Sequence, residues 1–167
     1  RSGLPTIQSA LEQALSKVAA EDITVVCAGR TDAGVNAAQQ VVHFDSTVCR
    51  SPLSWVSGGN HFLPKDITLL WAGQVKAEFH ARYTATGRTY RYLIYNAPVR
   101  SALASASFSW IYQPLDAQAM QEAAQCLLGE NDFSAFRGAD CQSKTPFRCV
   151  TEISVKRRGE LVILEVT

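Results

Sequence analysis

The spacing of apolar residues switches twice between a helical and a strand-like pattern, which limits the folds open to this chain. Apolar side chains at 5–19 fall on one helical face, and a second helix is expected at 115–129. Strand-like segments follow the helices at 23–28, 40–45, 66–75, 88–97 and, as a hairpin, 147–166. Because helices and strands do not alternate regularly, we predict an α+β fold with a largely antiparallel central sheet and helices on one face. The repeated order predicts two related α/β halves, 1–75 and 76–167.

Local signals predict where the helices begin and end. Ser9 and Glu12 have the spacing of a capping box near the start of the first helix. Asp116 is expected as the N-cap of the later helix and Gly129 as its stop. A short helix is predicted at 52–59, ending in a glycine turn.

Size and charge exclude several classes of protein. The chain has 167 residues, of which 47% are apolar, so it can bury a hydrophobic core. Its net charge is only +1, and nucleic-acid binding would therefore depend on local clusters of charge. No apolar stretch approaches the ~20 residues of a membrane span, and no signal-peptide pattern appears at the start of these residues. We expect a cytoplasmic protein, and we expect both ends to be cut from a longer one.

The cysteines and histidines give no metal-site pattern. The five cysteines are odd in number and form no C-x-x-C pair, and no histidine has metal-ligand spacing from them. Buried or idle thiols in a reducing compartment are expected. His43, His61 and His80 stand beside aromatic or apolar residues, so we expect structural histidines and no metal site.

A loop between two apolar runs in 25–45 holds an arginine and an aspartate. Gly29 and Gly34 permit tight turns there. Arg30 and Asp32 could form a structural ion pair, or Asp32 could be a nucleophile or general base beside an anion-binding Arg30. A phosphate loop is excluded, because neither G-x-x-x-x-G-K-[ST] nor G-x-G-x-x-G occurs.

Residues 76–100 interleave basic and aromatic side chains. Arginine can bind phosphate while aromatic rings stack on unpaired bases, so this stretch could contact nucleic acid. It equally fits an edge strand whose tyrosines face the core. The polar loop 140–144 could contact phosphates or sugars, or only water, whereas Phe133 and Phe136 are expected in the core.

Taken together, these segments resemble the TruA family of tRNA pseudouridine synthases, over nearly the whole chain. The likeness is carried by GRTDAGV at 29–35, QVVHFD at 40–45, FHARYTATGRTYRYLIYN at 79–96, CLLGENDFSAFR at 126–137 and CQSKTPFR at 141–148. It implies the pseudouridine synthase fold and an isomerase that converts uridine to pseudouridine in the anticodon stem-loop of tRNA (positions 38–40). It also implies a homodimer that binds tRNA and uses no cofactor.

The resemblance further implies roles for single residues. Asp32 matches the catalytic aspartate, Arg30 the arginine that helps to displace the target base, and Tyr90 the tyrosine that stacks on the target nucleotide. The tRNA-contacting stretches of the family match Phe79, His80, Ala81, Arg82, Tyr83, Asp140, Cys141, Gln142, Ser143 and Lys144. Arg88 and Arg91 are added as RNA-contacting candidates from the basic and aromatic strand.

Two differences from the family pattern leave an alternative open. Asn36 stands where the family usually has histidine; asparagine can keep one hydrogen bond but cannot titrate as an imidazole does. The family has an N-terminal strand, and a C-terminal arginine that pairs with the catalytic aspartate, which these residues do not include. An ionised Asp32 in a largely desolvated pocket would need a cation, and Arg30 is the local candidate. The alternative is an inactive or truncated tRNA-binding module, and a small-molecule lyase or hydrolase is a third, weaker reading.

Overall fold

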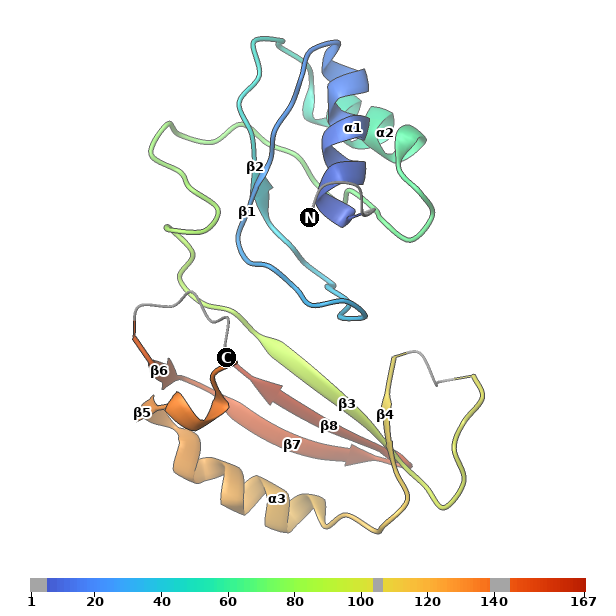
Figure 1. Ribbon diagram of the computed structural model, residues 1–167, viewed down its shortest axis with the longest axis vertical. Helices are drawn as coiled ribbons and strands as arrows, with labels where there is room; N and C mark the ends of the chain where they lie inside the picture. The colour runs from blue at the N-terminus through green and yellow to red at the C-terminus, as the bar shows by residue number, and fades with distance from the viewer. Residues whose placement is uncertain (1–5, 104–106, 139–144) are drawn as a thin grey trace. The chain divides into compact units, whose positions relative to one another are not determined.

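The computed structural model describes residues 6–103, 107–138 and 145–167. The chain divides into two compact units, Arg1–Ala85 and Thr86–Thr167 (Figure 1). Each unit has a hydrophobic cluster of its own. In the described ranges, no helix combines the length and the hydropathy that crossing a membrane requires.

The first unit combines two helices with a short two-stranded sheet. Its elements are α1 (Ile7–Ala19), β1 (Val26–Cys27), β2 (Val42–His43) and α2 (Pro52–Phe62). The strands are antiparallel, with Val26 opposite His43. Leu11 and Leu15 of α1 are buried in one cluster with Trp55 of α2 and with Ile23 and Val25 ahead of β1. The predicted helix and both strand segments are therefore present, although the strands are shorter than predicted.

The start of α1 differs from the prediction. Thr6 is the N-cap: its hydroxyl accepts a hydrogen bond from the Ser9 N–H (3.0 Å), and the Ser9 hydroxyl accepts one from the Thr6 N–H (3.1 Å). The prediction of a capping box formed by Ser9 and Glu12 is therefore wrong. Thr6 has the extended backbone that an N-cap needs, whereas Ser9 already lies in the first turn. The Glu12 carboxylate instead accepts from the Val25 N–H (3.1 Å).

The helix α2 continues past the glycines at which it was predicted to end. A Cβ at Gly59 would collide with Leu69 Cδ1, and a Cβ at Gly58 would lie 2.9 Å from Val18 Cγ2. Both glycines therefore permit close packing against neighbours instead of ending the helix. The helical cost of glycine, roughly 0.5–1 kcal/mol relative to alanine, is offset by this packing.

The strand predicted at 66–75 is wrong, because this segment joins no sheet in the described residues. The Asn60 amide of α2 takes the place of a strand partner: it donates to the Leu69 carbonyl (2.9 Å) and accepts from the Leu69 N–H (2.7 Å). Ile67 and Leu69 pack against the core, while Leu70 and Trp71 are exposed. Apolar and polar residues alternate here as in a strand, but among the described residues no neighbouring strand pairs with the backbone of this segment.

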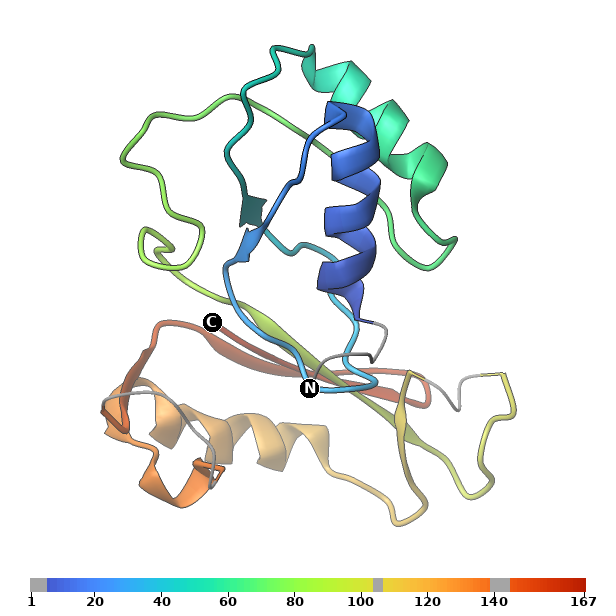
Figure 2. The same cartoon turned by 45° about the horizontal axis from the view of Figure 1, so that its top comes forward.

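The second unit is a sheet with one helix on a face (Figures 1 and 2). Its elements are β3 (Tyr90–Asn96), β4 (Ser109–Ile111), α3 (Ala117–Ala124), the 3₁₀ turn Gln125–Leu127, β5 (Gly129–Asp132), the 3₁₀ turn Ser134–Phe136, β6 (Phe147–Val150), β7 (Ile153–Arg158) and β8 (Leu161–Val166). The four-stranded sheet has the order β4-β3-β8-β7, and β5 pairs with β6 separately. Asp116 caps α3 as predicted, through bonds to the N–H groups of Gln118 and Ala119.

The α+β class is confirmed, but the sheets are mixed. β3 pairs with β4 in parallel, while β3, β8 and β7 are antiparallel neighbours. The predicted hairpin is β7–β8, and it turns at Gly159, whose φ is +59°, and Glu160. β6, which was predicted within it, pairs with β5 instead.

One aromatic prediction in this unit is wrong. Phe136 is 78% exposed, and Phe133 is half-buried. Phe133 precedes the 3₁₀ turn and Phe136 ends it, so their rings lie beside each other (5.9 Å between centroids), and neither residue belongs to the buried cluster. The buried cluster of the unit consists of Ile94, Ala124, Val155 and Val162.

Candidate active site

The glycine-flanked loop of the first unit is closed by hydrogen bonds at its base. The Ala28 N–H donates to the Val41 carbonyl (2.9 Å), and Gln40 Nε2 donates to the Gly29 carbonyl (2.9 Å). These bonds continue the β1–β2 pairing outward and fix where the loop leaves the sheet. The loop is thus attached at both ends to the strands that flank it.

Asp32 opens a tight turn within this loop. The Val35 N–H donates to the Asp32 carbonyl (3.2 Å), and Gly34 has a φ of +84°. A positive φ at the third position is what a type II turn requires, and glycine adopts it without steric cost. The turn therefore explains Gly34 and fixes the backbone that carries the Asp32 side chain.

The structural ion pair between Arg30 and Asp32 is absent. Both side chains are exposed, and within the described ranges the salt bridge is the pair Arg91–Glu165 instead. Asp32 is exposed, so the described residues of the first unit do not by themselves provide the desolvated surroundings expected for it. Among the described residues, the Asp32 carboxylate therefore faces solvent without a structural partner.

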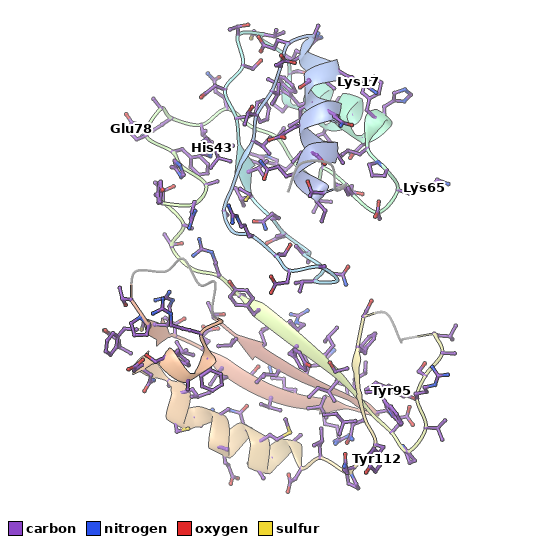
Figure 3. All side chains as sticks on the ribbon, in the orientation of Figure 1. Lys17, His43, Lys65, Glu78, Tyr95 and Tyr112 are labelled. Carbon is purple, nitrogen blue, oxygen red and sulfur yellow. The ribbon has the colours of Figure 1, made fainter. Side chains whose placement is uncertain are left out.

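The segment 76–84 of the same unit contains the predicted RNA-contacting residues Phe79 to Tyr83. Phe79 and His80 are half-buried and Ala81 is buried, whereas Arg82 and Tyr83 are exposed. Figure 3 shows His43 of β2 on the side that this segment occupies. The His43 Nδ1 accepts a hydrogen bond from the Ala81 N–H (3.2 Å). The structure thus brings the strand after the Asp32 loop into direct contact with this segment.

Tyr90, the predicted stacking residue, is the first residue of β3 in the second unit. The residue is 62% exposed, although its backbone is paired opposite Val166. Arg91 lies opposite Glu165 on β8, and its guanidinium forms a salt bridge with that carboxylate. A phosphate would therefore have to compete with Glu165 for Arg91. The RNA-contacting roles of Arg88 and Arg91 stay predictions.

Hydrogen bonds shift the acidity of three side chains. Bonds from Ser46 and Thr47 lower the pKa of Glu21, and bonds from Ser134 lower the pKa of Asp132. The hydrogen bond that Tyr95 donates to Glu160 raises the pKa of its phenol. Glu21 holds the segment that follows β2, a role that the sequence did not reveal because its partners are 25 and 26 residues away.

The polar loop predicted to contact tRNA, Asp140 to Lys144, lies outside the described residues. In the part of the chain that the structure does describe, histidine, cysteine, aspartate and glutamate residues do not gather in threes that could bind a metal ion. The described site residues therefore belong to two groups, one in each unit. The first is the Asp32 loop with segment 76–84, and the second is the start of β3.

Known proteins with similar sequences carry a consistent name. A family described as tRNA pseudouridine synthase matches residues 123–167. A tRNA pseudouridine synthase A from Legionella pneumophila is 52% identical over 167 residues, which is 100% of this chain and 64% of the relative. A protein of the same name from Coxiella burnetii is 50% identical over 166 residues, 99% of this chain and 64% of the relative. The chain thus spans 64% of the length of these relatives, and over that length its sequence is similar to tRNA pseudouridine synthase A.

Proposed function

We propose that this protein converts uridine to pseudouridine in the anticodon stem-loop of tRNA, with Asp32 as the catalytic group. The observation that carries this proposal is the state of the Asp32 side chain. It is exposed and, among the described residues, it has neither a cation nor a hydrogen-bond donor as partner. An exposed carboxylate without a partner is accessible to a substrate, and the segment that carries it, GRTDAGV at 29–35, resembles the segment of the family's catalytic aspartate.

The reaction is an isomerisation and requires few catalytic groups from the protein. The bond between uracil N1 and ribose C1′ breaks, the base turns, and C1′ joins C5. The C5 proton leaves and N1 gains a proton, so the nucleotide keeps its composition. Asp32 would either form a covalent adduct with the sugar or base, or remove a proton to give a glycal. Both routes begin from an ionised carboxylate and need no metal or redox group.

The target nucleotide has to leave its stack before Asp32 can reach it. Extruding a nucleotide costs a few kcal/mol, and the cost is smallest for a base in a loop or in a weak pair. This favours a target in the anticodon arm. The exposed Tyr90 ring offers a surface on which a base can stack, at ~1–3 kcal/mol per base. We assign Arg30 to the displaced backbone, since its guanidinium can pair with phosphate. Burial of Asp32 would then come from the bound nucleotide.

We further propose tRNA as the macromolecular partner, bound by a homodimer. The exposed Arg82 and Tyr83 combine a phosphate-binding cation with a stacking ring, which suits an RNA surface. Light scattering at micromolar concentration would test the dimer: a mass of two chains supports it, and a mass of one chain contradicts it.

Chemical mapping tests the site of modification. A tRNA transcript is incubated with the chain, treated with a carbodiimide that marks pseudouridine, and copied by primer extension. We expect stops one nucleotide 3′ of positions 38–40 and none in a transcript with cytidine at those positions. Stops elsewhere would contradict the anticodon assignment. A chain that binds the transcript but produces no stops would be a tRNA-binding module instead.

A further inference from the structure

Two histidines hold the segment 76–84, and each does so through its Nδ1 atom. His43 Nδ1 accepts from the Ala81 N–H (3.2 Å), and His80 Nδ1 accepts from the N–H groups of Arg82 and Tyr83 (3.2 Å each). The rings contact each other, with 4.7 Å between centroids. Three consecutive backbone N–H groups are therefore bonded to imidazole nitrogens.

These bonds fix the chemical state of both rings. A histidine nitrogen accepts a hydrogen bond only when it carries no proton, so each ring has to be neutral with its proton on Nε2. His80 acts on its own chain as a side-chain cap, since its acceptor bonds the N–H groups two and three residues later. Thr84 closes the same turn, because its N–H and hydroxyl both donate to the His80 carbonyl (2.9 and 2.8 Å).

The turn buries one of its side chains and exposes the next two to solvent. Ala81 is 4% exposed, whereas Tyr83 is 77% exposed and Arg82 is also exposed. One face of the Tyr83 ring stacks on His80, at 4.2 Å between centroids and 28° between planes. The opposite face of Tyr83 is left for another ring, and the Arg82 guanidinium has no partner among the described residues.

We propose that His43 and His80 are positioning residues that present Arg82 and Tyr83 to tRNA. This inference rests on the proposed function, and it assigns the RNA contact to Arg82 and Tyr83 while Phe79, His80 and Ala81 anchor the turn. His43 lies on β2, the strand that follows the Asp32 loop, so the same strand orients the carboxylate loop and the RNA-contacting turn.

Asparagine and glutamine distinguish this role from simple packing. The asparagine Oδ1 occupies nearly the place of Nδ1 and can accept the same bonds, whereas the glutamine Oε1 reaches toward the place of Nε2. We expect His43→Asn and His80→Asn to bind tRNA within about threefold of the parent chain. We expect His43→Gln and His80→Gln to bind about tenfold more weakly while remaining folded, as judged by circular dichroism. His61→Ala, which alters an exposed histidine of α2, is the matched control and should bind like the parent.

Two further measurements separate positioning from a general loss of fold. ¹⁵N NMR of the parent chain should show Nδ1 of His43 and His80 without a proton. In an Arg82→Ala background, His80→Gln should reduce the salt dependence of tRNA binding no further, because the cation that it positions is gone. Equal binding by the asparagine and glutamine variants, or a proton on either Nδ1, would overturn the inference while leaving the proposed function intact. A parent chain that neither binds nor modifies tRNA would overturn both.

Discussion

At the scale of single residues, the backbone of one turn decides where the Asp32 carboxylate points. Gly34 has a φ of +84°, and a Cβ there would meet no atom within 4 Å. Space is thus no obstacle to a side chain at this position, but backbone conformation is. The loop is accordingly sensitive to substitutions that change φ and tolerant of those that only add volume.

Gly34→Ala should therefore lower the free energy of unfolding by about 1 kcal/mol, because alanine is strained in the left-handed region. Gly138→Ala is the control, since a Cβ there also meets nothing and its φ is not in that region. Urea denaturation should show a change within about 0.5 kcal/mol for the control. Equal effects of the two substitutions would show that the turn does not depend on the Gly34 conformation.

Arg82→Ala should weaken tRNA binding and reduce the slope of log affinity against log salt by about 1, as expected for one lost phosphate contact. Lys65→Ala removes an exposed cation on another part of the same unit (Figure 3) and should leave the slope near that of the parent. Filter binding between low and physiological salt measures both. An unchanged slope for Arg82→Ala would remove this residue from the tRNA interface.

At the scale of elements, side chains distant in sequence replace the backbone partners that the local pattern leads one to expect. Asn60 bonds both the N–H and the carbonyl of Leu69, and Glu21 bonds Ser46 and Thr47. Each contact holds an irregular segment of the first unit to a side chain elsewhere in that unit. Their loss should therefore destabilise that unit without changing the charge or shape of the Asp32 loop.

Asn60→Ala should lower the free energy of unfolding by about 2 kcal/mol, because it leaves a part-buried N–H and carbonyl of Leu69 unbonded. Gln39→Ala removes an exposed amide and serves as the control. Urea denaturation compares the two variants. If Asn60→Ala is as stable as the control, the amide is not what holds this segment.

The lowered pKa of Glu21 leads to a prediction of how the stability of the chain depends on pH. Its hydrogen bonds lower its pKa in the folded state, so its contribution to stability is present above the ordinary glutamate pKa. That contribution should be lost as pH falls through the lowered folded value. Glu21→Gln should therefore make the chain less stable at pH 7 and narrow its difference from the parent in acid. Thermal unfolding at pH 7 and pH 3 measures this, and a difference that grows in acid would contradict the assignment.

The sequence predicted elements whose signals are local. The Asp116 cap and the β7–β8 hairpin depend on residues within a few positions of each other. The cap was placed correctly, and the hairpin was placed correctly over 153–166, although its first strand was predicted to begin at 147. Gly58 and Gly59 were misread as a stop because the reason for them, Val18 and Leu69, is distant in sequence. At the site, the pattern pointed to Asp32, but the bond from the Ala81 N–H to His43 spans 38 residues and leaves no periodic trace.

At the scale of the whole molecule, the described residues form two units with separate cores, and the candidate site residues are divided between them. Asp32, His43 and Arg82 belong to Arg1–Ala85, and Tyr90 belongs to Thr86–Thr167. The proposed roles are divided in the same way: the carboxylate belongs to the first unit, and the stacking ring belongs to the second. The chain as a whole, and not either unit alone, is the proper sample for a test of activity.

The most direct test of the central claim is the release of tritium from tRNA labelled at uridine C5, measured with the chain in excess over tRNA. The parent chain and Asp22→Asn, which alters another exposed aspartate of the first unit, should release tritium at equal rates. Asp32→Asn should release none while binding tRNA within a few-fold of the parent. Substantial release by Asp32→Asn would contradict the catalytic role of Asp32. Absence of release from the parent chain would contradict the proposed activity for these residues.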